Sequence, residues 1–395
     1  MKIKVGVIFG GETVEHEVSI ISALQAIKSL DKEKYEVVPI YIGKDKEWYY
    51  GHILLEIDTY KDIENSKRFL KRVTLYKRKD KFLLQQTTGL FRKDLTDLDV
   101  ILPVVHGNNV EDGTLAGYLD TVGIPYVSSR VLGSALGQDK VVMKQVMASC
   151  GIPIVDYTWF YDSEYLTNKD EILKDIKKIG YPVVVKPATL GSSVGITYVK
   201  SEKDIKAAIE EAIAYDVKIV VEKAVENLVE VNASVLGNYE MQRVSPIEEV
   251  MGEDEILSYQ DKYLSGSKTK GQGSKGMAST NRIIPARISD KLTKDIQETA
   301  IKVFKALNLS SVCRIDFLID KKANKFYVNE PNTIPGSLSF YLWKEDGLSY
   351  KELLNEMINA CIKEYKNRSR KTRSFESNIL ENFNGSKGCK GGLKK

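Results

Sequence analysis

The chain has 395 residues, of which 43% are hydrophobic and 28% are charged. This length is enough for two or three domains, and the composition is typical of a globular protein. It excludes a wholly disordered chain, a collagen-like repeat and a bundle of membrane helices, because no apolar run approaches the roughly 18 residues that one membrane span needs.

The net charge of +4 is unevenly distributed along the chain. Residues 366–395 contain nine basic and two acidic side chains, which leaves 49 basic against 52 acidic, a net charge of −3, in residues 1–365. We therefore expect a slightly acidic body that binds no nucleic acid. The segment 369–395 is expected to be a basic, disordered tail that catalysis does not require.

The cysteines and the N-terminus both favour a cytoplasmic protein. Cys150, Cys313, Cys361 and Cys389 are far apart and lack the spacing of metal ligands, which predicts reduced thiols. The apolar run 5–9 is too short for the core of a signal peptide. We expect no contact with a membrane.

Residues 1–135 alternate predicted strands with helices, which indicates an open α/β domain. Strands are expected at 2–9, 37–42 and 100–105, and helices at 14–30 and 114–122. Pro39 marks the second strand as a possible edge strand. The charged, aromatic-rich segment 45–98 interrupts this alternation and is interpreted as one or two inserted hairpins.

Residues 136–368 predict two smaller α+β lobes, with a boundary near residue 225. The first lobe combines helices at 140–148 and 202–214 with strands at 183–186 and 219–222. The second lobe combines strand-rich sequence, a polar loop at 265–279, and helices at 289–307 and 350–368.

A lysine and a glycine/serine turn follow one of these strands, in the sequence KPATLGSSVG from Lys186 to Gly195. An ammonium group and free backbone N–H groups suit a phosphate-bearing ligand. The turn is not a Walker loop, because no Gly-Lys-Ser/Thr ends it. An ordinary hairpin turn with a solvated lysine is the alternative.

Two further strands, 312–319 and 325–332, predict a hairpin with a polar patch on one face. If Asp320 stands opposite Phe326, then Asp316 stands opposite Glu330 and Arg314 opposite Asn332. Opposed carboxylates repel each other unless a cation lies between them, and Mg²⁺ on a nucleotide phosphate would meet that need. The alternative is a solvated strand face on which Arg314 neutralises Asp316.

A third group of polar residues lies at strand ends in the first domain, where open α/β sheets bind their ligands. Glu15 follows the first strand, and His106 ends the strand 100–105. A first-turn helix acid is the alternative for Glu15, and a solvent-exposed strand end for His106. Asp112 is interpreted as a turn or helix-capping residue.

In their order along the chain, these segments resemble the D-alanine–D-alanine ligase family of ATP-grasp enzymes, over residues 3 to about 365. The resemblance implies an ATP-grasp fold, in which an N-terminal α/β domain (1–135) precedes two α+β lobes (136–224 and 225–368) that clasp the nucleotide. The motifs that carry it are GGETVEHEVS at 10–19, HGNNVEDG at 106–113, Asp139-Lys140, the segment 186–195, DKY at 261–263, RID at 314–316 and NEPNTIPG at 329–336.

The resemblance also implies a mechanism. ATP phosphorylates the carboxylate of one D-alanine, and the amine of a second D-alanine attacks the resulting acyl phosphate, for peptidoglycan synthesis. ATP and two Mg²⁺ (or Mn²⁺) ions are the implied cofactors, and a homodimer is the implied assembly. The implied catalytic group comprises Arg314 and the N–H of Gly336 at the oxyanion, with Glu15, Ser192 and Tyr263 in a chain at the first ammonium group.

The remaining site residues are assigned by the same resemblance. The metal ligands are Asp316, Glu330 and Asn332; the nucleotide ligands are Lys140, Lys186, Ser193, Glu222 and Glu230; the substrate ligands are His106, Lys262, Ser339 and Tyr341.

Some positions depart from the family pattern. Val110 replaces a usual glycine, and the loop 265–279, expected to be a lid over the acyl phosphate, is longer and richer in lysine. The segment after Gly336 lacks the usual Ser/His-containing sequence ending in proline, so Ser339 and Tyr341 both remain candidates for the second carboxylate. A ligase of D-alanine to D-serine or another D-amino acid, and a catalytically silent nucleotide-binding relative, are the alternatives.

Overall fold

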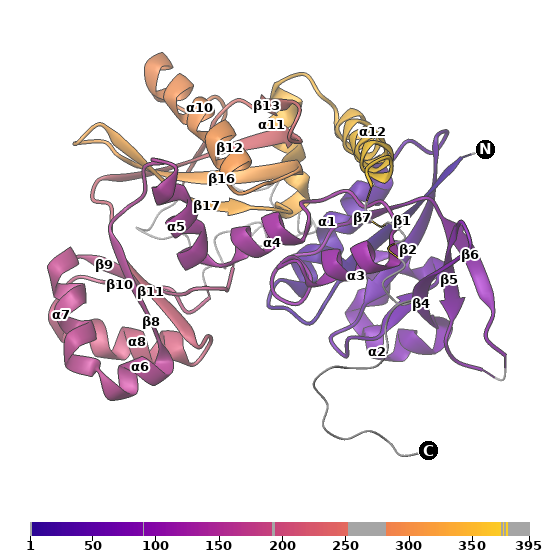
Figure 1. Cartoon of the computed structure of the whole chain (residues 1–395), viewed down its shortest axis with the longest axis horizontal. Helices are drawn as coiled ribbons and strands as arrows, with labels where there is room; N and C mark the ends of the chain where they lie inside the picture. The colour runs from indigo at the N-terminus through magenta and orange to yellow at the C-terminus, as the bar shows by residue number, and fades with distance from the viewer. Residues whose placement is uncertain are drawn as a thin grey trace.

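The computed structural model describes residues 2–89, 91–191, 194–251 and 282–372, together with Ser374 and Ser377. Three β-sheets, each formed by its own segment of the chain, organise the molecule. In Figure 1 the first sheet lies on the right, the second at the lower left and the third above the second. The mixture of α/β and α+β sheets confirms the predicted fold class.

The first sheet has seven strands in the order β6-β5-β4-β3-β2-β1-β7. At its centre, β1 pairs in parallel with β2 on one side and with β7 on the other. Its strands are β1 (Ile3–Gly10), β2 (Tyr35–Ile42), β3 (Trp48–Tyr50), β4 (Lys71–Arg78), β5 (Lys81–Gln86), β6 (Asp94–Leu98) and β7 (Val100–Pro103). Its helices are α1 (His16–Ser29), α2 (Ile63–Ser66) and α3 (Thr114–Val122), with 3₁₀ turns η1 (His52–Leu55), η2 (Ile57–Asp62) and η3 (Lys67–Phe69).

One prediction for this sheet needs correction, and one is confirmed. The strand with Pro39 is not an edge strand, because β3 pairs with it on the side away from β1. Since β3 pairs only with residues 40–42, Pro39 lies beyond its end and interrupts none of that ladder. The hairpins of the segment 45–98 do form, but they extend the first sheet rather than standing apart from it.

The second sheet is small and has the order β10-β9-β11-β8. Two helices, α4 (Val131–Gln138) and α5 (Lys140–Ser149), precede it. Its elements are β8 (Tyr157–Tyr161), α6 (Asp162–Thr167), α7 (Lys169–Ile179), β9 (Val183–Pro187), β10 (Thr197–Val199), η4 (Glu202–Asp204), α8 (Ile205–Ile213) and β11 (Lys218–Lys223).

The third sheet has the order β15-β14-β12-β16-β17, and β13 pairs with β12. Its long central strands carry the predicted hairpin. Its strands are β12 (Leu228–Gly237), β13 (Gln242–Val244), β14 (Glu248–Val250), β15 (Arg282–Ile283), β16 (Ser311–Asp320) and β17 (Lys325–Asn332). The helices are α10 (Asp290–Ala306), η7 (Gly336–Ser339), α11 (Phe340–Glu345) and α12 (Tyr350–Ser369).

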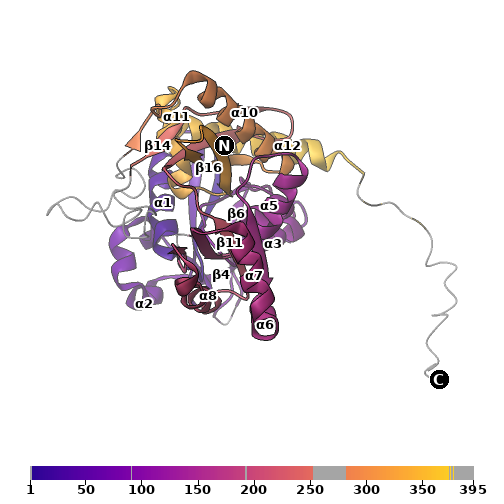
Figure 2. The same ribbon diagram turned by 90° about the vertical axis from the view of Figure 1, so that its left-hand side faces the viewer.

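Helices cover the outer faces of the second and third sheets, and this leaves their polar faces on the inside. Apolar residues of α10 form one core with alternate residues of β12 and β16, among them Val231 and Phe317. Residues of α7 and α8 form another core with β9 and β11. Figure 2 shows α10 at the top and α7 and α8 at the bottom, with the two sheets between them.

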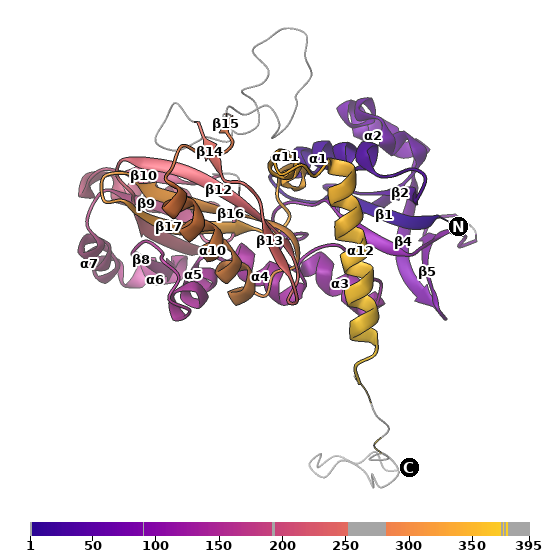
Figure 3. The same ribbon diagram turned by 90° about the horizontal axis from the view of Figure 1, so that it is seen from above.

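Helix α12 joins the first and third sheets, and in Figure 3 it runs between them. It begins with a capping box, in which Ser349 and Glu352 satisfy each other's backbone N–H groups. Its buried residues, including Leu354 and Ile358, belong to the core of the first sheet. Within the described residues, no helix is long and apolar enough to cross a membrane.

Candidate active site

One face of the third sheet carries a continuous polar row. Glu248, Asn232, Asp316 and Glu330 stand directly opposite one another on four adjacent strands. Directly opposed residues lie on the same face of a sheet, so these four side chains point toward the second sheet, away from α10. The alternating sequence of β12 places Asn232 here and its neighbour Val231 in the core, a signal that our sequence analysis did not use.

The predicted pairing of Asp316 with Glu330 and of Arg314 with Asn332 is confirmed. The assumed end of the hairpin is wrong, because Asp320 pairs with Lys325 and not with Phe326. A β-bulge at Asn329, between the pairs Phe317–Val328 and Asp316–Glu330, adds one residue and restores the predicted register at the site.

The bulge also places the Asn329 side chain near the second sheet. Its Oδ1 accepts a hydrogen bond from Lys186 Nζ at 3.2 Å. Asn329 is not among the predicted site residues, because a regular alternation provides no position for an extra residue.

Arg314 and Asp316 form a bidentate ion pair on this face. Arg314 donates from Nε and Nη2 to the two Asp316 oxygens at 2.7 and 2.8 Å, and Asn332 Nδ2 donates to Asp316 at 3.1 Å. The pairing matches the alternative in which arginine neutralises aspartate, but the face is not solvated, since the Arg314 side chain is 9% exposed. Burial opposes the charge of Arg314, yet the Asp316 carboxylate raises its pKa well above the usual value.

The donors around Asp316 fit a hard divalent cation. Two opposed carboxylates and one amide provide oxygen ligands of the kind that Mg²⁺ binds. The described residues contain no group of three or more His, Cys, Asp or Glu side chains that could hold a metal. The amide oxygen of Asn332, opposite Arg314 on the same face, is a further oxygen of this kind.

Lys140 reaches Glu330 from the start of α5. Asp139 caps this helix by accepting from the N–H groups of Val141 and Val142 at 2.9 and 3.0 Å. The cap fixes Lys140, whose Nζ lies 2.6 Å from the Leu190 carbonyl and 3.2 Å from Glu330 Oε2. The Asp139-Lys140 motif thus joins the turn that follows Lys186 to the carboxylates of the third sheet.

Two buried lysines hold Glu222 on the inner face of the second sheet. Lys186 donates to its Oε2 at 2.8 Å, and Lys144 Nζ lies 3.2 Å from its Oε1. Burial alone would raise the pKa of Glu222, but the two ammonium groups outweigh it and lower this pKa to about 2. Lys144 was missed in the sequence, although it stands one helical turn from Lys140.

Glu15 lies against two glycine loops of the candidate site. A Cβ atom at Gly191 would stand 2.7 Å from Glu15 Oε2, and one at Gly107 would stand 3.2 Å from it. The carboxylate therefore meets the turn that follows Lys186, as the resemblance implied. Only a residue without a side chain leaves it that space.

His106 and Glu111 hold the two backbone polar groups of one residue, Ile334. His106 Nδ1 lies 2.8 Å from the carbonyl oxygen of Ile334, and Glu111 Oε1 accepts from the Ile334 N–H at 2.9 Å. Burial, with a smaller contribution from Arg314, lowers the pKa of His106 to about 4. A neutral His106 that donates from Nδ1 to the carbonyl fits this geometry.

We expect the free energy of unfolding to depend on pH because of Glu111. Burial, followed by the neighbouring Glu15 carboxylate, raises the pKa of Glu111 from its usual 4.5 to about 7. Between these values the folded protein binds more protons than the unfolded chain, so stability falls as pH rises from 4.5 to 7. Glu111→Gln should remove a fall on the order of 1–3 kcal/mol between pH 5 and pH 8, measured by urea unfolding. Asp112→Asn, in the adjacent turn, should retain it; an unchanged pH profile in Glu111→Gln would contradict the assignment.

The segment after Gly336 has an unusual backbone. Ser337, Leu338 and Ser339 all have φ near +50°, in the left-handed region that residues with a side chain rarely adopt. Such conformations concentrate at functional sites. Ser339 is fully buried, and its Oγ has no hydrogen-bond partner among the described residues. Tyr341 is also buried and donates to Glu248 Oε2 at 3.2 Å.

The structure thus brings together most of the predicted site residues that it describes. Gly336 begins the turn η7, beside α1, and Glu230 lies on β12, two residues before Asn232 on the same face. Four predicted site residues lie outside the described residues, together with the predicted lid: Ser192, Ser193, Lys262 and Tyr263.

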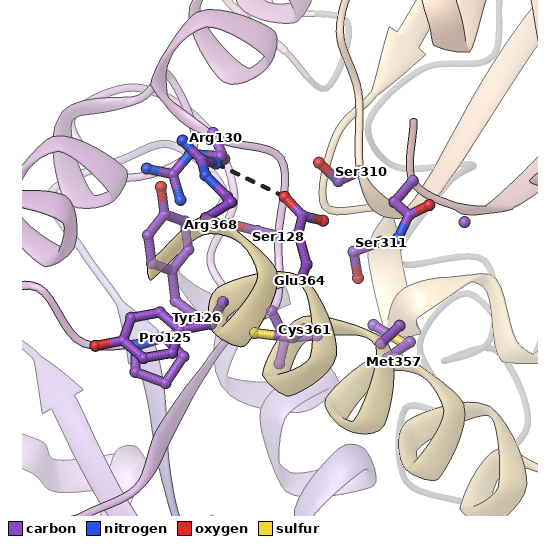
Figure 4. A pocket seen from close by; sticks show the side chains of 15 residues that line it. Pro125, Tyr126, Ser128, Arg130, Ser310, Ser311, Met357, Cys361, Glu364 and Arg368 are labelled. Carbon is purple, nitrogen blue, oxygen red and sulfur yellow. Dashed lines mark ion pairs between the residues drawn. The ribbon is translucent and has the colours of Figure 1, made fainter. Parts of the chain in front are cut away.

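A pocket with none of these residues lies between the first domain and α12. Figure 4 shows Arg130, Ser311 and Cys361 around it, and Arg368 Nη1 there lies 3.6 Å from Glu364 Oε1. It is separate from the polar row described above.

Two facing sheets, with lysines on one and carboxylates on the other, define an ATP-grasp enzyme. Family models match at residues 4–129 (D-ala D-ala ligase N-terminus) and 146–359 (D-ala D-ala ligase C-terminus). A D-alanine–D-alanine ligase of Thermosipho melanesiensis is 38% identical over 381 residues, 96% of this chain and 98% of the relative. The chain belongs to the D-alanine–D-alanine ligase family.

Solved structures agree with this assignment. The D-alanine–D-alanine ligase of Coxiella burnetii superposes with a TM-score of 0.76 at 28% identity, over 93% of this chain and 96% of that one. The VanG D-Ala:D-Ser ligase of Enterococcus faecalis gives a TM-score of 0.74 at 30% identity, over 91% and 100%. The neighbours therefore include ligases with two different second substrates.

Proposed function

We propose that this protein joins two D-alanine molecules to D-alanyl-D-alanine through a D-alanyl phosphate, with conversion of ATP to ADP and phosphate. The observation that carries the proposal is the polar face of the third sheet. There Arg314, Asp316, Glu330 and Asn332 meet two lysines from across the gap, Lys140 and, through Asn329, Lys186. Carboxylates for a metal ion, ammonium groups for phosphates and a buried guanidinium are what an acyl-phosphate ligase needs.

In this proposal the first D-alanine binds at Glu15, which would hold its ammonium group, with His106 near its carboxylate. Its carboxylate oxygen attacks the γ-phosphorus of ATP and displaces ADP. Lys140 and Lys186 would bind the phosphates, and Glu222 and Glu230 the adenine and the ribose. Mg²⁺ on Asp316, Glu330 and Asn332 would supply charge neutralisation at the phosphate oxygens.

The second step makes the peptide bond. The amine of the second D-alanine adds to the acyl carbon, Arg314 and the N–H of Gly336 stabilise the oxyanion, and phosphate leaves. Ser339 and Tyr341 lie in the segment assigned to the second carboxylate. The proposal includes a homodimer and a cytoplasmic location, which the free thiols of Cys150, Cys313 and Cys361 suit.

The test measures ADP release with Mg·ATP and D-alanine alone, and then with D-alanine plus D-serine or D-lactate, with products identified by mass spectrometry. We expect D-alanyl-D-alanine as the main product. Preferential D-alanyl-D-serine would move the assignment to the VanG-like alternative. Nucleotide binding without D-alanine-dependent ADP release would instead indicate a catalytically silent relative.

A further inference from the structure

Three side chains form a second cluster on the polar face, beside Arg314. They are Glu248 on β14, Arg282 on β15 and Tyr341 on α11, and we call them the β14–β15 cluster. The Arg282 guanidinium stacks 3.8 Å above the Tyr341 ring, and its Nη1 lies 3.1 Å from Glu248 Oε1. Tyr341 donates to the other Glu248 oxygen at 3.2 Å, so one carboxylate holds both partners in place.

The cluster belongs to the same face as the catalytic row. Arg282 pairs with Val250, which lies two residues after Glu248 on β14, so the two charged residues point the same way. Arg314 acts on Tyr341 as well: burial and Glu248 raise the pKa of the Tyr341 hydroxyl, while Arg314 and Arg282 lower it.

Burial makes this cluster unlike an ordinary surface ion pair. The side chains of Arg282 and Glu248 are 11% and 3% exposed. The next residue on β14 provides a comparison, since Glu249 pairs with Arg287, whose side chain is 59% exposed. Burying an ion pair costs desolvation energy, and a fold commonly retains one where it defines a specific geometry.

The position of the cluster suits the incoming second substrate. Across the sheet, the proposed metal ligands lie on β16 and β17, whereas the cluster lies beyond β12, on β14 and β15. In the proposed reaction the phosphate of the acyl phosphate lies beside the metal ligands. The second substrate is therefore expected on another side of the acyl carbon. A guanidinium has five N–H donors in a fixed fork, so the same group can contact Glu248 and a second carboxylate.

We propose that Arg282 is a substrate-binding residue that receives the carboxylate of the second D-amino acid, with the Tyr341 ring holding its guanidinium flat. The inference rests on the proposed function. Ser339 and Tyr341 are the residues predicted from the sequence for the subsite of the second carboxylate; the inference adds Arg282 as a ligand there and Glu248 as the residue that positions it. It concerns the carboxylate, so it applies equally to D-alanine, D-serine and D-lactate as second substrates.

The experiment offers D-alanine and D-alaninamide together as competing second substrates. D-Alaninamide has the amine but lacks the carboxylate, and the ratio of the two products, measured by mass spectrometry, reports recognition of that group. Arg282→Met should lower the ratio of D-alanyl-D-alanine to its amide at least tenfold relative to the unmodified protein. Arg282→Lys, which keeps a charge but loses the planar fork, should give an intermediate ratio.

Arg287→Met is the matched control, because it removes the same group from the neighbouring pair on β14 and should leave the ratio unchanged. The proposal would be overturned if Arg282→Met lost both products equally and preserved their ratio. If the methionine variant does not fold, an unchanged ratio in Arg282→Lys would overturn it instead. Failure of the proposed function itself is distinct, since the unmodified protein would then make neither product.

Discussion

Asp316→Asn is expected to lower kcat by roughly 10³-fold or more at saturating Mg·ATP and D-alanine. The substitution removes the carboxylate that stands opposite Glu330 and that accepts from Nε and Nη2 of Arg314. It therefore weakens the proposed metal site and releases the proposed oxyanion ligand at once. Steady-state ADP release, with a thermal unfolding curve to establish folding, measures the effect.

Asp320→Asn serves as the control for this prediction. Asp320 lies on the same strand, four residues further on, where its carboxylate accepts from the N–H groups of Lys322 and Ala323 in the hairpin turn. Its kcat should remain within about twofold of the unmodified protein, because surface turns lie outside the site. A kcat for Asp316→Asn within tenfold of the original would refute the role given to the hairpin.

Lys144→Met is expected to lower the free energy of unfolding by about 3–5 kcal/mol and to raise the KM for ATP at least tenfold. The reason is that Lys144 is fully buried against Glu222, and removing one partner of a buried ion pair leaves an uncompensated charge. Glu222 would then be held by Lys186 alone, and the position of that lysine in the proposed phosphate site would change. Urea unfolding and ATP titration measure the two effects.

Two further variants isolate the cause. Lys177→Met breaks an ion pair with Glu202 whose side chains are both more than half exposed, and should cost less than about 1 kcal/mol. Glu222→Gln tests the same pair from its other side: it leaves both Lys144 and Lys186 without their shared carboxylate and should cost at least as much as Lys144→Met. Urea midpoints that are equal for Lys144→Met and the unmodified protein would show that the pair carries no such energy.

The hairpin shows how much the sequence could predict about the site. Alternation along the two strands placed Asp316 opposite Glu330, which the structure confirms, although the assumed turn was one residue out. The bulge at Asn329 compensates for that difference. Alternation contains no signal for a bulge, so the position of Asn329 against Lys186 could not be derived from the pattern.

Other parts of the site depend on contacts between distant segments. His106 and Ile334 meet across 228 residues, and neither the sequence pattern nor the family resemblance predicted this contact. Lys144 could have been found, because its spacing from Lys140 puts both on one helix face. Charged helix residues are usually solvent-exposed, however, and helical spacing does not distinguish a buried lysine from an exposed one.

The hydrogen bonds from His106 and Glu111 to the Ile334 backbone limit which of the three sheets can move apart. His106 and Glu111 of the first domain hold the backbone of the segment that follows β17, and Ser22 accepts from the Ser337 N–H at 2.9 Å. Separating the first and third sheets would break these backbone bonds. Between the second and third sheets, Lys186 contacts Asn329, and Lys140 at the start of α5 contacts Glu330; both are side-chain contacts. A polyphosphate arriving at those lysines would exchange one set of ionic partners for another and leave the backbone joint intact.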